Sequence, residues 1–185
     1  MPHIKTITPE IADGELKRAY ENLKKTRGKI AEVHKIQSLN PAALTAHMEL
    51  YMTIMFGKSP LKRYQREMLG VVVSAVNRCE YCINHHEQAL LAYWKDKEKT
   101  KFLIHNRSAL HLSHEDQLLC ALAEKLTMNK EQDYSEDISI LQKAGLEDRV
   151  ILDAVQVIAY FNFVNRLVLG LGVEFTDEEM KGYKY

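Results

Sequence analysis

The chain has 185 residues, of which 46% are apolar and 27% charged, as is typical of a globular protein with a sizeable core. Its 25 Lys and Arg balance its 25 Asp and Glu, so no net charge favours nucleic acid, an anionic membrane or an acidic partner. We expect neither a secretion signal nor a membrane span, because the start lacks an apolar segment and no run of about 18 apolar residues occurs.

Helix-forming residues dominate the chain, and its few prolines and glycines mark helix ends. Three dipeptides pair an N-cap residue with proline at a first helical position: Thr8-Pro9, Asn40-Pro41 and Ser59-Pro60. Four glycines fall where C-terminal caps are expected: Gly28, Gly57, Gly145 and Gly172. These marks predict helices over 14–27, 41–56, 60–77, 80–94, 96–104, 114–128, 136–144 and 147–171. No alternating strand pattern stands out, so the predicted fold class is all-α.

We expect one helical domain over residues 1–185, with a core of 35–175 and a helical hairpin at 60–94. A weak internal similarity relates residues 64–82 to residues 148–166, since both run from charged residues through an apolar helix into a polar turn. Two weakly similar helical halves are therefore the alternative to a single undivided unit.

The most informative segment is residues 79–86, with the sequence CEYCINHH. Residues three and four apart are neighbours on a helix, so Cys79, Cys82 and His86 form one stripe. This arrangement is typical of a cysteine pair that opens and closes a disulfide beside a proton acceptor.

Three features of the sequence favour a reactive thiolate in this motif. Cys79 lies at the expected helix start, where unpaired N–H groups stabilise an anion. His86 lies one turn beyond Cys82 and can accept its proton. Glu67 is on the preceding helix, and a turn near Arg78 would put Glu67 and His86 about 5 Å apart in height. The sequence therefore predicts that a carboxylate–imidazole–thiol relay can form.

Two other interpretations of the motif remain open from the residues alone. A metal ion could bind the two cysteines, His86 and either His85 or Glu67. A structural zinc site, however, usually takes four ligands from two such motifs, and this chain has one. The cysteines could also pack in a helical core without any chemistry. We predict no resident metal ion and no cofactor.

Two neighbours of the thiols are candidates for a supporting role. Tyr81 falls between the cysteines and could contact a substrate, whereas His85 points roughly 100° away, toward the surface or an interface. The third cysteine, Cys120, lies in an apolar helix and is expected to be a core thiol. Three cysteines without a secretion signal favour a reducing compartment, so we expect a cytoplasmic protein.

Two segments carry a resemblance to a known family. Glu67, eleven intervening residues and the segment 79–86 match one family's Glu, C-x-x-C and His pattern at the same spacings. The sequence IAYFNFVNRL at 158–167, followed by GLGV at 170–173, is similar to a C-terminal signature of one branch of that family. The chain thus resembles the alkylhydroperoxidase D (AhpD)-like group of the carboxymuconolactone decarboxylase superfamily, and more narrowly its peroxidase-related branch.

This resemblance implies an all-α fold, homo-oligomers and a peroxiredoxin-type activity without haem or flavin. Cys82 would attack a hydroperoxide, and Cys79 would resolve the resulting sulfenic acid as a disulfide. His86 and Glu67 would form the proton relay, through a water molecule. A thiol or dithiol reductant, a lipoylated protein in the best-described members, would recycle the disulfide. Those members place a histidine between the cysteines, where this chain has Tyr81.

Two alternative functions use the same fold. One is a metal-binding or redox-sensing protein that uses the thiols and His86 without turnover. The other is a decarboxylase-like enzyme that acts on a small organic acid without thiols, and the retention of both cysteines counts against it. Asn162, Asn165 and Arg166 form a polar stripe on an apolar helix. They could cap the thiol hairpin, line a pocket or lie at a subunit interface.

Overall fold

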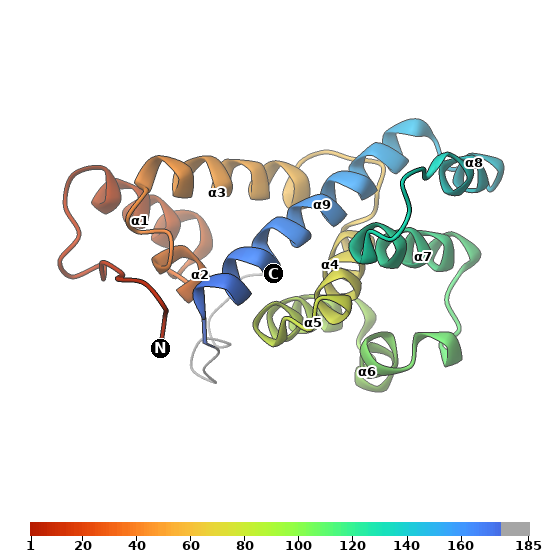
Figure 1. Cartoon of the computed structure of the whole chain (residues 1–185), viewed down its shortest axis with the longest axis horizontal. Coiled ribbons are helices and arrows are strands. Elements are labelled where there is room, and N and C mark those ends of the chain that lie inside the picture. The colour runs from red at the N-terminus through yellow and green to blue at the C-terminus, as the bar shows by residue number, and fades with distance from the viewer. Residues whose placement is uncertain (175–185) are drawn as a thin grey trace. The chain divides into compact units, whose positions relative to one another are not determined.

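The computed structural model describes residues 1–174, and residues 175–185, the end of the predicted domain, lie outside them. Within the described range the chain forms helices and no strand, so the all-α prediction is confirmed. The helices are α1 (Gly14–Arg27), α2 (Glu32–Lys35), α3 (Pro41–Phe56), α4 (Arg63–Val76), α5 (Glu80–Trp94), α6 (Lys97–His105), the 3-10 turn η1 (Arg107–Ala109), α7 (His114–Met128), α8 (Ser135–Lys143) and α9 (Asp148–Leu171) (Figure 1).

The proline-based helix starts are confirmed in one case and wrong in two. Asn40 caps α3, because its Oδ1 accepts a backbone N–H of the first turn at 3.1 Å. Ser59 does not start α4, which begins at Arg63; its hydroxyl donates to the Asp153 carboxylate and accepts the Leu61 backbone N–H at 3.0 Å ahead of the helix. Thr8 heads a turn before α1 rather than a helix. The fixed φ of proline suits a turn as well as a helix start, which explains both errors.

Three of the four predicted glycine caps adopt the left-handed conformation, with φ of 82° at Gly28, 91° at Gly145 and 67° at Gly172. Gly57 follows α3 without a positive φ. The sequence did not predict α2 or η1, which are too short to show a periodic apolar pattern.

The chain divides into two compact units, which we describe separately. One comprises Met1–Met52 and the described residues from Arg166 onward, and the other comprises Thr53–Asn165. The helices α3 and α9 each contribute residues to both units. All the predicted site residues belong to the second unit. The single domain over 1–185, and the alternative of two similar halves, stay predictions.

The first unit has a small core between α1 and α3. Leu16, Tyr20 and Leu23 repeat at helical spacing on α1 and pack with Leu44 and Met48 of α3. The Tyr20 hydroxyl also donates to a backbone carbonyl in the segment before α1, at 2.8 Å, so the N-terminal segment is tied to this core.

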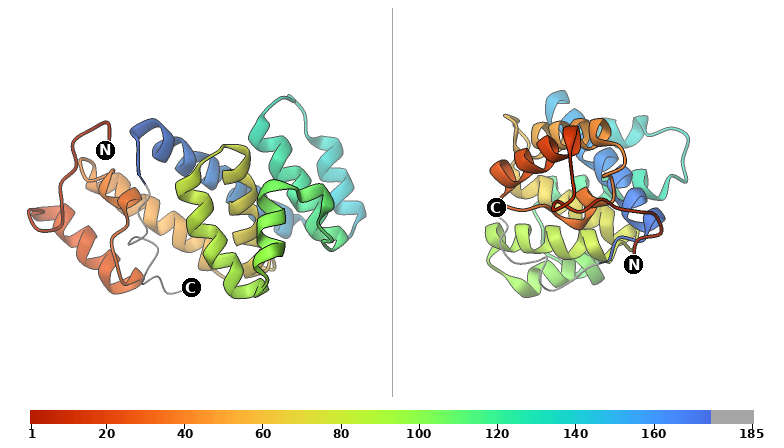
Figure 2. Two further views of the ribbon diagram at one scale, coloured as in Figure 1. Left: turned by 90° about the horizontal axis from the view of Figure 1, so that it is seen from below. Right: turned by 90° about the vertical axis from the view of Figure 1, so that its left-hand side faces the viewer.

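The second unit is organised around α4, which is buried continuously from Gln65 to Ser74. This helix packs against both α5 and α7, and Figure 2 shows α4 and α5 side by side. Gln65 fixes α4 to the start of α7, because its Nε2 donates to Glu115 at 2.9 Å and to Asp116 at 2.8 Å. A helix buried on all sides is a rigid platform for side chains that project from it.

By length and composition alone, α9 is the one helix of residues 1–174 that could cross a membrane. The core helix of a soluble protein has the same properties, and two asparagines of α9 make hydrogen bonds within the second unit. The expectation of no membrane partner stays a prediction.

Gly70 of α4 allows the Phe161 ring of α9 to approach the helix backbone. A Cβ at Gly70 would lie 2.6 Å from Phe161 Cζ, and this ring is fully buried. Replacing a glycine inside a helix with alanine ordinarily stabilises it by about 1 kcal/mol. Here we expect Gly70→Ala to destabilise the protein by about 1–3 kcal/mol, measured by urea unfolding, because the core would be overpacked.

A second substitution tests the cause of this effect. Phe161→Leu removes the ring atoms that the new methyl group would meet, so the cost of Gly70→Ala should shrink in that background. An equal cost in both backgrounds would show that the ring is not responsible.

Candidate active site

The two cysteines lie at the junction of α4 and α5, as predicted. Cys79 is the N-cap of α5, and Asn77 is the C-cap of α4. Between them Arg78 adopts a left-handed φ of 55°, which costs a non-glycine residue about 1–2 kcal/mol. The Cys79 backbone N–H donates to the Ser74 carbonyl at 2.9 Å, so the tight turn is held from both sides. The position of the first thiol is therefore well defined.

Both thiols are free and buried. Cys79 has 0% of its surface exposed and Cys82 has 3%. The sequence predicts their proximity but not this depth. Because reactive thiolates need access to the oxidant, reaction at this pair requires a local opening, such as fraying of the first turn of α5.

The two thiols differ in acidity. The pKa of Cys79 is lowered, chiefly because the Cys82 thiol can donate its hydrogen to the Cys79 sulfur; burial opposes this, and the Cys82 backbone N–H adds to the lowering. The pKa of Cys82 is raised well above its ordinary value, by the same thiol contact, by burial and by the negative charge of a Cys79 thiolate. When the pair loses one proton, the thiolate is therefore favoured on Cys79 and the remaining proton on Cys82.

Glu67 and His86 lie in direct contact, as the hairpin geometry predicts. His86 Nδ1 lies 2.5 Å from Glu67 Oε2, and the Glu67 side chain is only 1% exposed. A carboxylate only accepts, so Nδ1 carries the hydrogen and Nε2 of a neutral imidazole is the free base.

Arg63 completes a buried charge cluster that the sequence analysis missed. Its Nη2 lies 2.5 Å from Glu67 Oε1, and its guanidinium lies 4.2 Å from the centre of the Phe56 ring. Burial alone would raise the pKa of Glu67, but His86 and then Arg63 stabilise the carboxylate and hold the pKa below its ordinary value. The i,i+4 spacing of Arg63 and Glu67 is the sequence signal that could have identified this partner.

Within residues 1–174, His86 makes no hydrogen bond to either thiol. Its side chain is 15% exposed, and the ring packs edge-on to Phe161 with centroids 4.5 Å apart. Among the described residues, its one hydrogen bond is that to Glu67. The ring is thus held on two sides, by Glu67 and by Phe161.

The structure pairs Tyr81 with His85 rather than placing them as independent residues. Their rings stack with centroids 4.3 Å apart, and Nδ1 of His85 donates to the Tyr81 carbonyl at 2.7 Å. Tyr81 is buried, with 5% exposed. The supporting role of both residues stays a prediction.

Asn162 and Asn165 cap the thiol hairpin, the first of the three alternatives that the sequence leaves open. The Asn77 side chain at the end of α4 donates to Asn162 at 2.9 Å and to Asn165 at 3.0 Å. Arg166 is exposed and lies in the other unit of the chain. The sequence predicted the need for partners but could not identify Asn77.

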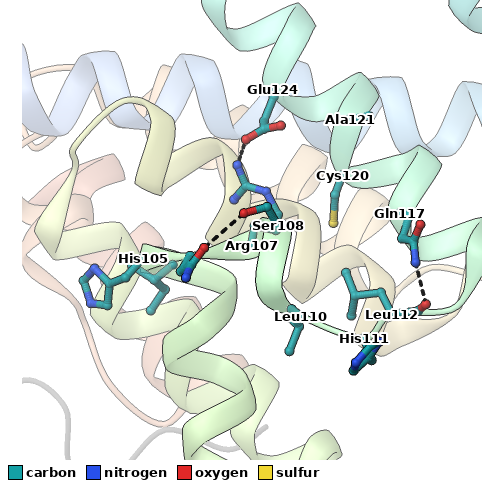
Figure 3. Close-up of a pocket in the computed structure, with 12 residues that line it drawn as sticks. His105, Arg107, Ser108, Leu110, His111, Leu112, Gln117, Cys120, Ala121 and Glu124 are labelled. Carbon is teal, nitrogen blue, oxygen red and sulfur yellow. Dashed lines mark hydrogen bonds and ion pairs between the residues drawn. The ribbon is translucent and has the colours of Figure 1, made fainter.

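The third cysteine lies apart from this site. Cys120 of α7 is buried beside a pocket of about 610 Å³ that is also lined by Arg107 and Glu124, which form an ion pair (Figure 3). Burial raises the pKa of Cys120 to about 12, so this thiol is not a nucleophile at neutral pH. This agrees with the predicted core thiol. In the part of the chain that the structure describes, no three His, Cys, Asp or Glu side chains gather as metal ligands.

These features define a class of protein: an all-helical chain with a C-x-x-C pair at a helix N-terminus and a buried Glu–His pair on the adjoining helices. The sequence profile of the Carboxymuconolactone decarboxylase family matches residues 41–125. This match and the solved structures described next support assignment of the chain to this superfamily and to its AhpD-like group. Members of the superfamily are enzymes, which supports the general expectation of an enzyme.

Solved structures of similar fold support this assignment. A peroxidase-related protein from Silicibacter sp. TM1040 is 26% identical, with a TM-score of 0.83 over 97% of this chain and 95% of the other. A peroxidase-related protein with an AhpD core from Ralstonia eutropha JMP134 is 19% identical, with the same TM-score over 97% and 94%. The debrominase Bmp8 is 14% identical, with a TM-score of 0.78 over 96% and 94%. The last two likenesses concern the fold. No curated protein sequence matches the chain.

Proposed function

We propose that the protein is a thiol-dependent peroxidase that reduces hydroperoxides with the Cys79/Cys82 pair. The observation that carries this proposal is the buried contact of 2.5 Å between Glu67 and His86, on the same hairpin as the pair. A carboxylate that orients an imidazole near a nucleophile is the recurring arrangement of covalent catalysis. Core packing alone would not need a buried carboxylate there.

The reaction begins with thiolate attack on the peroxide. Transfer of the remaining proton from Cys82 to Cys79 makes Cys82 the nucleophile, which attacks the outer oxygen of ROOH. The O–O bond breaks, Cys82 becomes a sulfenic acid, and the alkoxide takes a proton to leave as ROH. That proton is the one that Nε2 of His86 takes up through water when the thiol pair first loses a proton.

The second step forms the disulfide. His86 takes the proton of Cys79 through water, and the Cys79 sulfur attacks the Cys82 sulfur, releasing hydroxide that is protonated to water. In total, two thiols and ROOH give a disulfide, ROH and water. A thiol or dithiol reductant, such as a lipoylated protein, returns the pair to two thiols.

Three further expectations belong to this proposal. The protein acts as a homo-oligomer, by analogy with its family. It works in the cytoplasm, where its three free cysteines stay reduced. It uses no cofactor, since thiols, imidazole and carboxylate suffice for the chemistry.

A thiol titration before and after peroxide tests the proposal. Hydrogen peroxide should remove two of the three titratable thiols, and dithiothreitol should return both. Cys82→Ser should abolish peroxide consumption, whereas Cys79→Ser should leave a sulfenic acid that dimedone traps. Cys120→Ser is the matched control and should behave like the unchanged protein.

Turnover separates the enzyme from its rivals. With excess dithiothreitol, a peroxidase consumes many equivalents of peroxide much faster than dithiothreitol alone does, whereas a slowly oxidised redox sensor does not exceed that background rate. Peroxide that leaves all three thiols titratable would overturn the proposal.

A further inference from the structure

The Glu67 carboxylate is held between two donors that come from different helices. Arg63, one turn earlier on α4, places Nη2 2.5 Å from Oε1, and His86 of α5 places Nδ1 2.5 Å from Oε2. The Glu67 side chain is 1% exposed, and those of Arg63 and His86 are 20% and 15% exposed. The three side chains form a mostly buried row, which ends on the helix that carries Cys82.

The guanidinium of Arg63 is directed at Glu67. Its Nε and Nη1 atoms are buried and make no hydrogen bond to residues 1–174. The guanidinium also lies 4.2 Å from the centre of the Phe56 ring, which attracts a cation through its π electrons. An arginine that only filled space between helices would keep its head group in water. This arrangement instead holds a full positive charge beside one oxygen of Glu67.

The charged side chains that contact Glu67 are those of Arg63 and His86. The other titratable groups close to α4 have partners elsewhere. Arg66 donates to four backbone carbonyls, and on α5 the His85 ring bonds to a carbonyl of its own helix. On α7 and α9 the pairs are Asp116 with Tyr64, Glu115 and Asp116 with Gln65, and Asp153 with Arg149 and Ser59. The helices α3 and α6 contribute uncharged side chains, which are Phe56, Thr100 and Leu103.

The net charge of the row depends on Arg63. With Arg63 and Glu67 both ionised, the row is neutral when the imidazole is neutral and carries one positive charge when His86 is protonated. Without Arg63, the row would carry one negative charge until His86 takes up a proton. A buried site disfavours an unbalanced charge. Arg63 therefore favours the neutral imidazole, whose Nε2 can accept a proton.

We infer that Arg63 is a positioning residue that keeps His86 available as a proton acceptor by balancing the charge of Glu67. This inference rests on the proposed function, in which His86 takes up a proton and returns it. A proton carrier works best when both of its forms are populated near the working pH. Glu67 alone would orient the ring but would also hold it as an imidazolium, which has no free base.

The test follows the His86 ring by nuclear magnetic resonance over a pH series, in the reduced full chain. The signal of this ring is identified by its absence from His86→Gln. Arg63→Gln keeps an N–H donor for Glu67 but removes the positive charge. We expect the titration midpoint of the ring to rise by about one pH unit or more, because an unbalanced carboxylate favours the charged imidazole. Below both midpoints, the neutral fraction would then fall about tenfold.

Two further variants separate charge from contact. Arg63→Lys keeps the positive charge with a different shape, so it should restore the midpoint of the unchanged protein. Arg149→Gln is the matched control, because it removes the arginine of another i,i+4 pair with an acid in the same unit. It should leave the midpoint where it is. An equal rise in Arg63→Lys and Arg63→Gln would assign the effect to the shape of the guanidinium and overturn the inference.

The unchanged protein provides a second measurement if Arg63→Gln does not fold. Its His86 ring should be neutral at neutral pH with the hydrogen on Nδ1, as read from the chemical shifts of the two ring nitrogens. An imidazolium at neutral pH, or an unshifted midpoint in a folded Arg63→Gln protein, would contradict the inference. These measurements need no peroxide, so their failure and the failure of the proposed function are distinguishable.

Discussion

Replacing Glu67 with Gln should slow the oxidation of the thiol pair by hydrogen peroxide at least about a hundredfold. Each Glu67 oxygen has its own donor, Arg63 on one side and His86 Nδ1 on the other. A glutamine offers one acceptor and one donor, so one of these partners would face a second N–H group. The imidazole then loses the anion that orients it and that stabilises its protonated form.

The rate of thiol loss, followed by stopped flow against pH, checks this expectation. Glu124→Gln is the matched control, because it also removes the carboxylate of a Glu–Arg ion pair in the same unit, at the Cys120 pocket. It should leave the rate unchanged. A folded Glu67→Gln protein with the original rate and pH profile would remove Glu67 from the relay.

Acid sensitivity should change in the same variant. The folded protein lowers the pKa of Glu67 from 4.5, so the unfolded chain binds a proton there more readily. The charge cluster therefore stabilises the fold above pH 4.5, and this stability is lost as pH falls through the lower folded pKa. Unfolding of Glu67→Gln should depend less on pH in that range.

The hairpin and its relay were predictable from sequence because helical spacing determines them. Residues three and four apart share a face, and a short turn puts two helices in antiparallel contact. These rules suffice to place Cys79 at a helix start, Cys82 and His86 on one stripe, and Glu67 opposite His86. No knowledge of the rest of the chain was needed.

The features that tune the site depend on contacts between distant residues. Phe161 meets Gly70 and His86, and Asn165 meets Ser74 and the Asn77 amide. These pairs are far apart in sequence, and α9 shows no motif that identifies its partners. The burial of both thiols has the same origin, since it comes from the packing of whole helices around α4. Periodicity predicts which face of a helix is apolar but not what covers it.

Arg66→Met should cost about 3 kcal/mol or more in free energy of unfolding, because Arg66 satisfies backbone carbonyls that helix geometry leaves without partners. Its side chain is buried, with 4% exposed, immediately before Glu67. Its guanidinium donates to four carbonyl oxygens: Ile54 at 3.1 Å, Met55 at 2.9 Å, Gly57 at 3.0 Å and Leu61 at 3.1 Å. Methionine keeps much of the side-chain length but has no donor.

Urea unfolding of an exposed arginine variant provides the comparison. Arg149→Met breaks an ion pair with Asp153 whose arginine is 61% exposed, and such pairs contribute about 1 kcal/mol or less. Both variants lose one positive charge in the same unit. The difference between their free energies of unfolding therefore measures the cost of leaving the buried carbonyl oxygens without a donor. If both variants lose the same small free energy of unfolding, water can hydrogen-bond the carbonyl oxygens at the end of α3. Arg66 would then not hold the segment that leads into α4. A large cost for Arg66→Met alone would show that the helix bearing Glu67 is anchored at its start.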